Sequence, residues 1–263
     1  MSLTDEGHYG PKQLNLLKIV WGEGFLSPGG TDEIDKIIED INVSNKSVLD
    51  IGCGCGGAAI HLINKYGVKS VLGIDIEPLV IIRAQELAKK YNVSNITEFR
   101  CVTPGPLQMP DNSIDLVFSK EVFLHITNKK NLMKDIHRVL KPGGIIAVSD
   151  WMRFDDKPPS IQMKEYIAAE GLEMHMCSLK NYENLLKETG FININIKDRN
   201  EWYLNKAKEE LASIEGPLKK KVLEAIGQEE TVGAIDIWKK LIGVLKTGEH
   251  RPGHFNAEKI NIY

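Results

Sequence analysis

The sequence has little of what marks secreted, membrane-embedded or metal-bound proteins. Its 263 residues include only four cysteines, too few for a disulfide framework, and Cys53 and Cys55 form a C-x-C pair without further ligands at zinc-site spacing. No apolar run approaches the roughly 20 residues of a membrane-spanning helix, and no basic region followed by an apolar segment opens the chain. We therefore expect a cytoplasmic protein with no metal site and no membrane association.

An excess of charge of one sign is also absent. The chain has 33 lysines and arginines against 36 aspartates and glutamates, a formal net charge of −3, which does not favour a nucleic-acid partner. Hydrophobic residues make up 42% and charged residues 26%, as in ordinary globular domains, and neither repeats nor low-complexity tracts occur. We expect a single domain that acts on a small molecule; the sequence predicts no oligomeric state.

A glycine-rich turn is the most informative feature that the sequence does contain. The apolar run 48–51 leads into this turn, and an amphipathic helical pattern follows. Gly52, Gly54 and Gly57 satisfy G-x-G-x-x-G, and Asp50 gives D-x-G-x-G. Glycines allow a tight turn and the close approach of a ligand, and the N–H groups that begin the next helix bind polar groups. The stretch predicts a nucleotide-type cofactor loop.

An acid at the end of the second predicted strand narrows the ligand to a nucleoside. Asp75 follows the apolar residues 71–74, and a carboxylate there accepts hydrogen bonds from both ribose hydroxyls. Ile76 is then placed to pack on the base. The alternative, that Asp75 caps the helix beginning at Pro78, stays open at this point.

Helical and strand patterns alternate through the first two-thirds of the chain. This alternation predicts a parallel sheet with crossover helices, whose ligands bind beyond the carboxyl ends of the strands. Gly52, Asp75, Thr103 and Ser119 each follow a predicted strand, so one site would gather them. We expect helices at 13–21, 31–41, 78–91, 130–140 and 179–189, and strands at 47–51, 70–74, 96–101, 114–119, 145–150 and 191–197.

The pattern changes after Asp198. Residues 201–246 indicate two or three helices, broken near Gly216 and Gly227, and residues 253–259 indicate a last strand. We expect one domain over 1–263, built of a cofactor and substrate lid (1–45), a cofactor-binding core (46–198), a helical cap inserted before the last strand (199–250), and that strand (251–263).

Three features together resemble the class I S-adenosylmethionine-dependent methyltransferases over about residues 40–150. They are the D-x-G-x-G turn, the acid after the second strand, and the turn Leu140-Lys141-Pro142-Gly143-Gly144 before the strand at 145. The resemblance implies a Rossmann-like α/β sheet, mostly parallel with its last strand antiparallel, with N-terminal helices and a helical cap. It also implies S-adenosylmethionine as cofactor and S-adenosylhomocysteine as product. A dinucleotide-dependent enzyme, which the glycine motif alone allows, usually has its loop nearer the N-terminus and lacks the second turn.

Segments outside this core are similar to the phosphoethanolamine N-methyltransferases. The resemblance implies an amine acceptor and a catalytic pair formed by Tyr9 and His125. An amine must lose a proton before its lone pair can attack, and a histidine titrates near neutral pH. A structural role for His125, which follows an apolar run, is the alternative. The similar segments are 4–9, 21–30, 118–126 and 251–255.

Three positions depart from that family. The phosphate-binding arginine is expected four residues after Tyr166, where this chain has Glu170, and a carboxylate repels phosphate. An unphosphorylated or cationic amine therefore competes as the acceptor. Trp151 stands where the family has tyrosine, and Thr103 where it has an acid for the adenine amino group. Trp151 and Tyr166 are still expected to contact the acceptor.

The leading function is methyl transfer from S-adenosylmethionine to the amine nitrogen of a small molecule. The alternatives are transfer to oxygen or carbon of another metabolite, or S-adenosylmethionine binding without catalysis. Ser27 and the lid are expected to close over the methionine part of the cofactor. The residues predicted to bind the cofactor are Tyr9, Ser27, Asp50, Gly52, Gly54, Asp75, Ile76, Thr103, Ser119 and Lys120.

Overall fold

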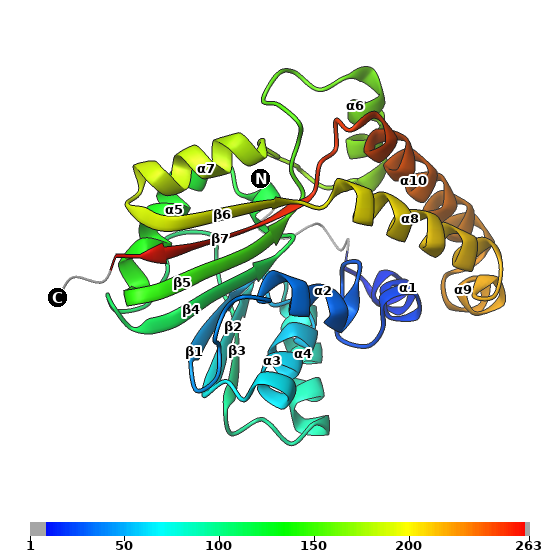
Figure 1. Cartoon of the computed structure of the whole chain (residues 1–263). Helices are drawn as coiled ribbons and strands as arrows, with labels where there is room; N and C mark the ends of the chain where they lie inside the picture. The colour runs from blue at the N-terminus through cyan, green and yellow to red at the C-terminus, as the bar shows by residue number, and fades with distance from the viewer. Residues whose placement is uncertain (1–8, 261–263) are drawn as a thin grey trace.

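The computed structural model describes residues 9–260 of the chain. Residues 4–8 of the predicted N-terminal motif and residues 261–263 of the predicted last segment lie outside the described residues. Figure 1 shows a fanned sheet with helices on both faces and a group of helices beyond one end of its strands.

The sheet has seven strands in the order β3-β2-β1-β4-β5-β7-β6. β1, β2, β3, β4 and β5 pair in parallel, and β7 is antiparallel to both of its neighbours, β5 and β6. The predicted fold class, with an antiparallel last strand, is confirmed. The strands are β1 (Ser47–Ile51), β2 (Ser70–Asp75), β3 (Thr97–Cys101), β4 (Ile114–Lys120), β5 (Leu140–Asp150), β6 (Phe191–Asp198) and β7 (Gly253–Lys259).

Alternating side chains build two cores, one on each face of the sheet. Val48 of β1 packs with helices α2, α3 and α4, whereas its neighbour Leu49 packs with α5 and α7 on the opposite face. Because both faces are covered, the central strands are apolar throughout. These helices are α2 (Gly30–Ile37), α3 (Gly57–Tyr66), α4 (Pro78–Lys90), α5 (Lys129–Val139) and α7 (Leu179–Glu188).

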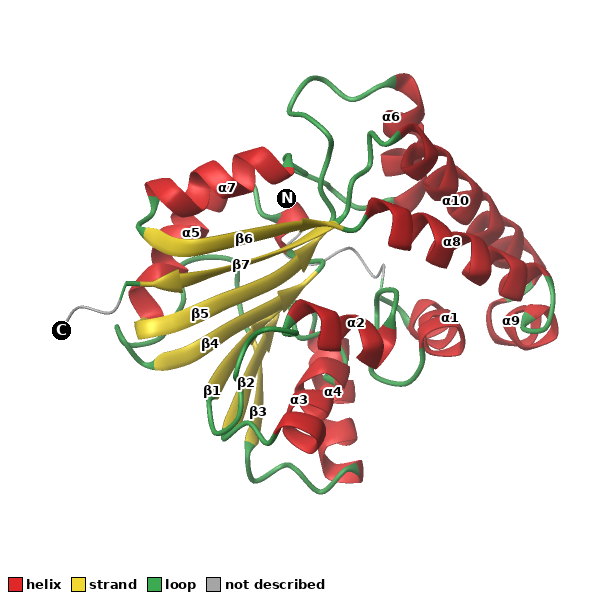
Figure 2. Ribbon diagram, viewed as in Figure 1, coloured by secondary structure: helices red, strands yellow, loops and turns green. Residues whose placement is uncertain are grey.

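The remaining helices form a second layer beyond the carboxyl ends of the strands (Figure 2). α8 and α6 pack on α10 around Tyr166, Tyr203 and Leu245, and α1 packs on α9 through Leu16 and Val222. The layer therefore includes α6 and α1 as well as the three helices after β6. They are α1 (Pro11–Trp21), α6 (Ile161–Glu170), α8 (Asn200–Glu215), α9 (Lys219–Ile226) and α10 (Gln228–Thr247).

The turn predicted at 140–144 is part of β5 instead. Leu140 pairs with Ile114 and Ile145 with Leu116, so the pairing register shifts between them. Gly143 has a φ of +72°, which lets the chain bend within the strand without ending it. α2 also ends earlier than predicted, at Ile37, while the other predicted boundaries agree closely. Within residues 9–260, no helix is both long and apolar enough to cross a membrane.

Candidate active site

A cavity of about 1300 Å³ opens at the carboxyl ends of β1, β2 and β4. The segment that follows α1 forms part of its wall, so the cavity lies between the sheet and the N-terminal region. Among the residues predicted for the site, it is lined by Tyr9, Ser27, Asp50, Gly52, Gly54, Asp75, Ile76, Thr103, Lys120 and His125.

The glycine turn is required by its surroundings. Gly52 has a φ of +72°, and a Cβ on it would lie 2.0 Å from Val122 Cγ2. Gly54 has a φ of +50°, and a Cβ there would lie 3.0 Å from Leu26 Cδ1. The turn is joined to the N-terminal region, because the Gly57 N–H donates to the carbonyl of Gly24 at 3.0 Å. Larger residues would therefore strain the backbone and fill the cavity edge.

Two carboxyl groups meet behind this turn. Asp75 Oδ2 accepts from the Gly54 N–H at 2.9 Å and Oδ1 from the Glu77 N–H at 3.1 Å, so Asp75 fixes the turn as well as lining the cavity. Asp50 is 2% exposed, and its Oδ2 has no hydrogen-bond partner within the described chain. Burial, aided by the nearby Asp75, raises the pKa of Asp50 to about 8. The site therefore holds a neutral carboxyl that a cation would ionise.

The two predicted catalytic residues face the same cavity from different elements. His125 ends the short 3₁₀ turn Phe123–His125, and its Nδ1 donates to the carbonyl of Glu173 at 2.9 Å. That bond assigns the ring proton to Nδ1 and the lone pair to Nε2. Tyr9 packs beside Leu14 and Val80 as it lines the cavity. Both residues thus line the cavity that the glycine turn and Asp75 also line.

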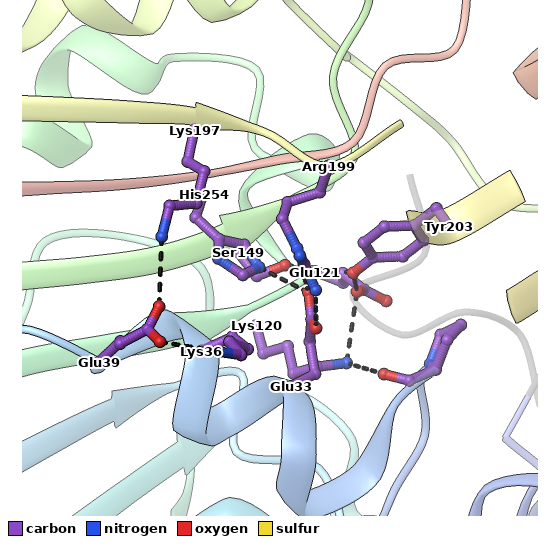
Figure 3. Close-up of polar contacts among 11 residues, drawn as sticks. Glu33, Lys36, Glu39, Lys120, Glu121, Ser149, Lys197, Arg199, Tyr203 and His254 are labelled. Carbon is purple, nitrogen blue, oxygen red and sulfur yellow. Dashed lines mark hydrogen bonds and ion pairs between the residues drawn. The ribbon is translucent and has the colours of Figure 1, made fainter. Parts of the chain in front are cut away.

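The predicted residues Ser27 and Lys120 belong to a polar cluster at the end of β4, which also includes Glu121 and Tyr203 (Figure 3). Lys120 donates to Ser27 Oγ and, at 2.8 Å, to the carbonyl of Pro28. Glu121 Oε1 accepts from Lys120 at 3.3 Å and from the Tyr203 hydroxyl of α8, whereas its buried Oε2 has no partner in residues 9–260. The left-handed φ of Glu121, +58°, is strained for a non-glycine residue, as is common at functional sites.

A second ionic cluster joins the lid to the rest of the molecule (Figure 3). Glu33 of α2 accepts from Arg199 at 2.6 and 3.2 Å and bonds to His254 Nε2 of β7 at 2.6 Å. Burial alone would raise the pKa of Glu33, but His254 and Arg199 outweigh it and lower the pKa. Glu33 therefore stays ionised although it is 1% exposed.

Three predicted residues do not line the large cavity. Ser119 is fully buried within the sheet, and its hydroxyl donates to the Ile51 carbonyl at 2.8 Å. Trp151 lines a second, smaller cavity, together with Glu170. Tyr166 is fully buried and packs against Trp151, with ring centroids 6.2 Å apart.

The loop of Thr103 is held from α5. Asp135 accepts from the Leu107 N–H, and Arg138 donates to the carbonyls of Leu107 at 2.9 Å and Met109 at 2.7 Å. The loop therefore has a fixed course. Thr103 and Gln108 are polar residues of this loop that line the cavity.

The cavity fits a nucleoside with a cationic tail. The glycine turn leaves space that a Cβ would fill, and Asp75 lies at the end of β2, where ribose hydroxyls bind in such folds. The unpartnered Asp50 oxygen suits a charged amino group, such as that of a methionine moiety. Sheet order, glycine turn and acid together define a class I S-adenosylmethionine-dependent methyltransferase.

Comparisons with known proteins agree with this class. The chain belongs to the methyltransferase-domain family, whose model matches residues 42–208. It is 32% identical to phosphoethanolamine N-methyltransferase 1 of Arabidopsis thaliana over 91% of this chain and 48% of that protein. It is 27% identical to phosphoethanolamine N-methyltransferase of Plasmodium falciparum over 97% of this chain and 92% of that protein. The cofactor of the class is S-adenosylmethionine, and S-adenosylhomocysteine is its product.

A solved structure shows the same architecture. Phosphoethanolamine N-methyltransferase 2 of Haemonchus contortus, in complex with phosphomonomethylethanolamine and S-adenosylhomocysteine, matches with a TM-score of 0.88 and 26% identity. The match covers 97% of this chain and 59% of that one. The chain spans about half the length of the plant relatives that it matches.

Proposed function

We propose that this protein transfers the methyl group of S-adenosylmethionine to the nitrogen of a small amine. The observation that carries the proposal is that Tyr9, Glu121 and His125 line the same cavity as the glycine turn and Asp75. Groups that handle a proton or a cation thus share one cavity with the cofactor-side residues. The relatives' names point to a phosphoethanolamine-like amine as one acceptor to test.

The protein's part in the reaction is to position the amine and remove its proton. When bound, S-adenosylmethionine supplies an electrophilic methyl group on a sulfonium sulfur. The acceptor enters as an ammonium ion, and His125 takes a proton from it at Nε2, because the Glu173 carbonyl holds the ring proton on Nδ1. Tyr9 orients the amine. Alignment of nitrogen, methyl carbon and sulfur supplies much of the remaining rate.

Glu121 attracts the cationic form of the acceptor in this account. Its Oε1 is occupied by Lys120 and Tyr203, whereas Oε2 is buried without a partner among the described residues. An ammonium N–H would satisfy that oxygen, and the contact is strong in a site from which water is excluded. Lys120 balances part of the carboxylate charge, so the site does not depend on the ligand for folding.

The cofactor side follows from the same geometry. Asp75 holds the ribose, Ile76 packs on the adenine with Thr103 near its polar edge, and the Gly52–Gly54 turn admits the methionine part. Asp50 and Lys120 complete this wall, and Ser119 supports it from within the sheet. Ser27, held by Lys120, closes over the methionine part.

The domain roles and the location belong to the same proposal. Residues 1–45 act as the lid and 46–198 bind the cofactor, while 199–250 cap the acceptor and the last segment, 251–263, contributes β7 (Gly253–Lys259) to the sheet. Two contacts between these parts support the proposal. The hydrogen bond from the Gly57 N–H to the Gly24 carbonyl joins core and lid, and the ion pair of Arg199 with Glu33 joins cap and lid. A reducing, cytoplasmic setting is supported by the four free cysteines, three of them buried.

Replacement of the histidine tests the function. His125→Ala should lower kcat for the amine by about 100-fold or more, while the Kd for S-adenosylmethionine stays within about twofold, because the change removes a proton acceptor and no cofactor contact. Steady-state kinetics and calorimetry measure the two quantities. His175→Ala, a histidine of the same region that pairs with Glu173, is the matched control and should retain activity. Retention of more than about a tenth of kcat by His125→Ala would remove His125 from the mechanism.

A further inference from the structure

A second cavity, of about 280 Å³, lies between α1, α10 and the end of α6. Trp21, Trp238 and Trp151 line it, together with Glu170. The indole N–H groups of Trp21 and Trp238 donate to Glu210 at 2.9 and 3.0 Å. These two rings therefore present carbon and π-electron surface to the cavity. The polar residues that line it are Glu170, Lys12, Gln13 and Glu230.

Trp151 on the cavity wall also belongs to a buried cluster of aromatic rings. The ring of Trp151 lies 6.2 Å from that of Tyr166 and 5.3 Å from that of His250, and the latter two lie 5.7 Å apart. Trp151 Nε1 and His250 Nε2 are buried with no hydrogen-bond partner in the part of the chain that the structure describes, whereas the hydroxyl of Tyr166 interacts with the carboxyl of Glu170. Buried polar atoms are nearly always paired, so the unpaired Nε1 of Trp151, a residue of the cavity wall, indicates that a ligand or water binds beside it.

Three charged residues line the cavity: Lys12, Glu230 and Glu170. Lys12 lines the cavity but is paired with Glu230, and no described Lys, Arg or His side chain forms an ion pair with Glu170. Aromatic faces and an unpaired carboxylate together attract a cation. A phosphate placed here would face Glu170 without a free cation to balance it.

The two cavities meet at the lid. Ser27 and Lys120 line the large cavity, Pro28 lines the small one, and Lys120 donates to both the Ser27 hydroxyl and the Pro28 carbonyl. Tyr203 continues this boundary, because it donates to Glu121 and packs in the same cluster as Trp151 and Tyr166. A ligand whose reactive amine lies at Glu121 would extend toward Glu170.

We propose that the small cavity holds the far end of the acceptor and that this end is an unphosphorylated organic cation. The inference rests on the proposed function and names its substrate class, a small amine with a second cationic group. Glu121 binds the amine that is methylated, and Glu170 with the ring of Trp151 binds the second cation. This assignment separates the chain from relatives that are named for a phosphorylated acceptor.

Binding of matched ligands tests the assignment. The full chain, saturated with S-adenosylhomocysteine, is titrated by calorimetry with 1,4-diaminobutane, n-butylamine or phosphoethanolamine at pH 8. Burial raises the pKa of Glu170 to about 7, although its hydrogen bond with Tyr166 lowers it. Because pH 8 lies above this pKa, Glu170 is mostly ionised in the experiment. The diamine should bind at least about tenfold more tightly than the monoamine, and phosphoethanolamine more weakly than the diamine.

Two variants on one helix show whether Glu170 causes the preference. Glu170→Gln should reduce the advantage of the diamine over n-butylamine to less than about threefold, while Glu165→Gln, exposed on the same helix, should keep it. S-adenosylhomocysteine binding shows that each variant is folded. The inference is overturned if Glu170→Gln keeps the preference, if phosphoethanolamine binds as tightly as the diamine, or if no acceptor binds to the saturated chain.

A turnover assay distinguishes failure of this inference from failure of the proposed N-methyltransferase function. Methylation of phosphoethanolamine but not of the diamine would overturn the cationic assignment and leave the N-methyltransferase function standing. Glu170-dependent binding of the diamine, with no amine methylated in the presence of S-adenosylmethionine, would support the cavity assignment and contradict the function.

Discussion

Asp50 is the residue whose protonation state should respond most directly to binding of the cofactor. Its carboxyl is buried beside the glycine turn, one oxygen is unpaired among the described residues, and burial with Asp75 nearby raises its pKa to about 8. At pH 7 the empty site therefore holds a protonated carboxyl. The α-amino group of S-adenosylmethionine is a cation that favours the ionised form.

Cofactor binding at pH 7 should consequently release close to one proton from Asp50. Because the folded pKa lies near 8, the release should fall away as the pH rises above 8, where the carboxyl is already ionised. Calorimetry in two buffers with different ionisation enthalpies measures the number of protons. Asp50→Asn should release none from this site; equal release by the variant and the original chain would show that another group titrates.

The glycine turn is readable from the sequence, and Ser27 and Lys120 of the cluster at β4 were predicted as well, whereas the contact between Glu121 and Tyr203 was not. Gly52 and Gly54 are dictated by local backbone geometry, so a short motif reveals them. Glu121 acquires its role only when Tyr203, far along the chain, approaches it from α8. No local pattern encodes that contact. The strained φ of Glu121 becomes visible only in the folded structure.

At the scale of elements, one buried carboxylate connects α2, α8 and β7. Glu33 lies on α2, Arg199 precedes α8 and His254 lies on β7, so the three side chains fix lid, cap and sheet relative to one another. Arg199 also lies over the ring of Trp202, 4.7 Å from its centroid. These contacts join α2 to the residues at the start of α8 and on β7.

Arg199→Ala should lower the free energy of unfolding by about 3 kcal/mol, because it leaves a buried carboxylate with only His254 as partner. Lys197→Ala, an exposed neighbour on β6 whose partner is Glu39, should be indistinguishable from the original chain. Urea denaturation of both variants provides the comparison. A loss below about 1 kcal/mol for Arg199→Ala would mean that the Glu33 cluster does not hold the elements together.

Element positions were predicted well where the hydrophobic period is clear. β1 agrees with the prediction, because a short apolar run before the glycine turn defines it, and β7 was expected at the same residues. β5 was predicted to begin too late, because Pro142 and Gly143 are typical of turns, yet a shift in pairing register absorbs them within the strand. Tertiary pairing decides such boundaries.

At the scale of the whole molecule, a sheet that binds the cofactor is covered by a helical layer that adds a second cavity. The sequence predicted the sheet and its cofactor edge, because these follow from alternation and one motif. It did not predict that α1, α6 and α10 would enclose a cavity with Trp21, Trp151 and Glu170 on its wall. That enclosure depends on the packing of three helices that are distant in sequence.

The most direct test of the account is acceptor-dependent methyl transfer. The full chain is incubated with S-adenosylmethionine and each of phosphoethanolamine, ethanolamine and 1,4-diaminobutane, and S-adenosylhomocysteine and the methylated product are quantified by mass spectrometry. The account predicts S-adenosylhomocysteine formation that requires an amine and yields an N-methylated product. Tight S-adenosylmethionine binding without turnover on any of these amines would contradict it and indicate a cofactor-binding protein that does not transfer methyl groups to amines.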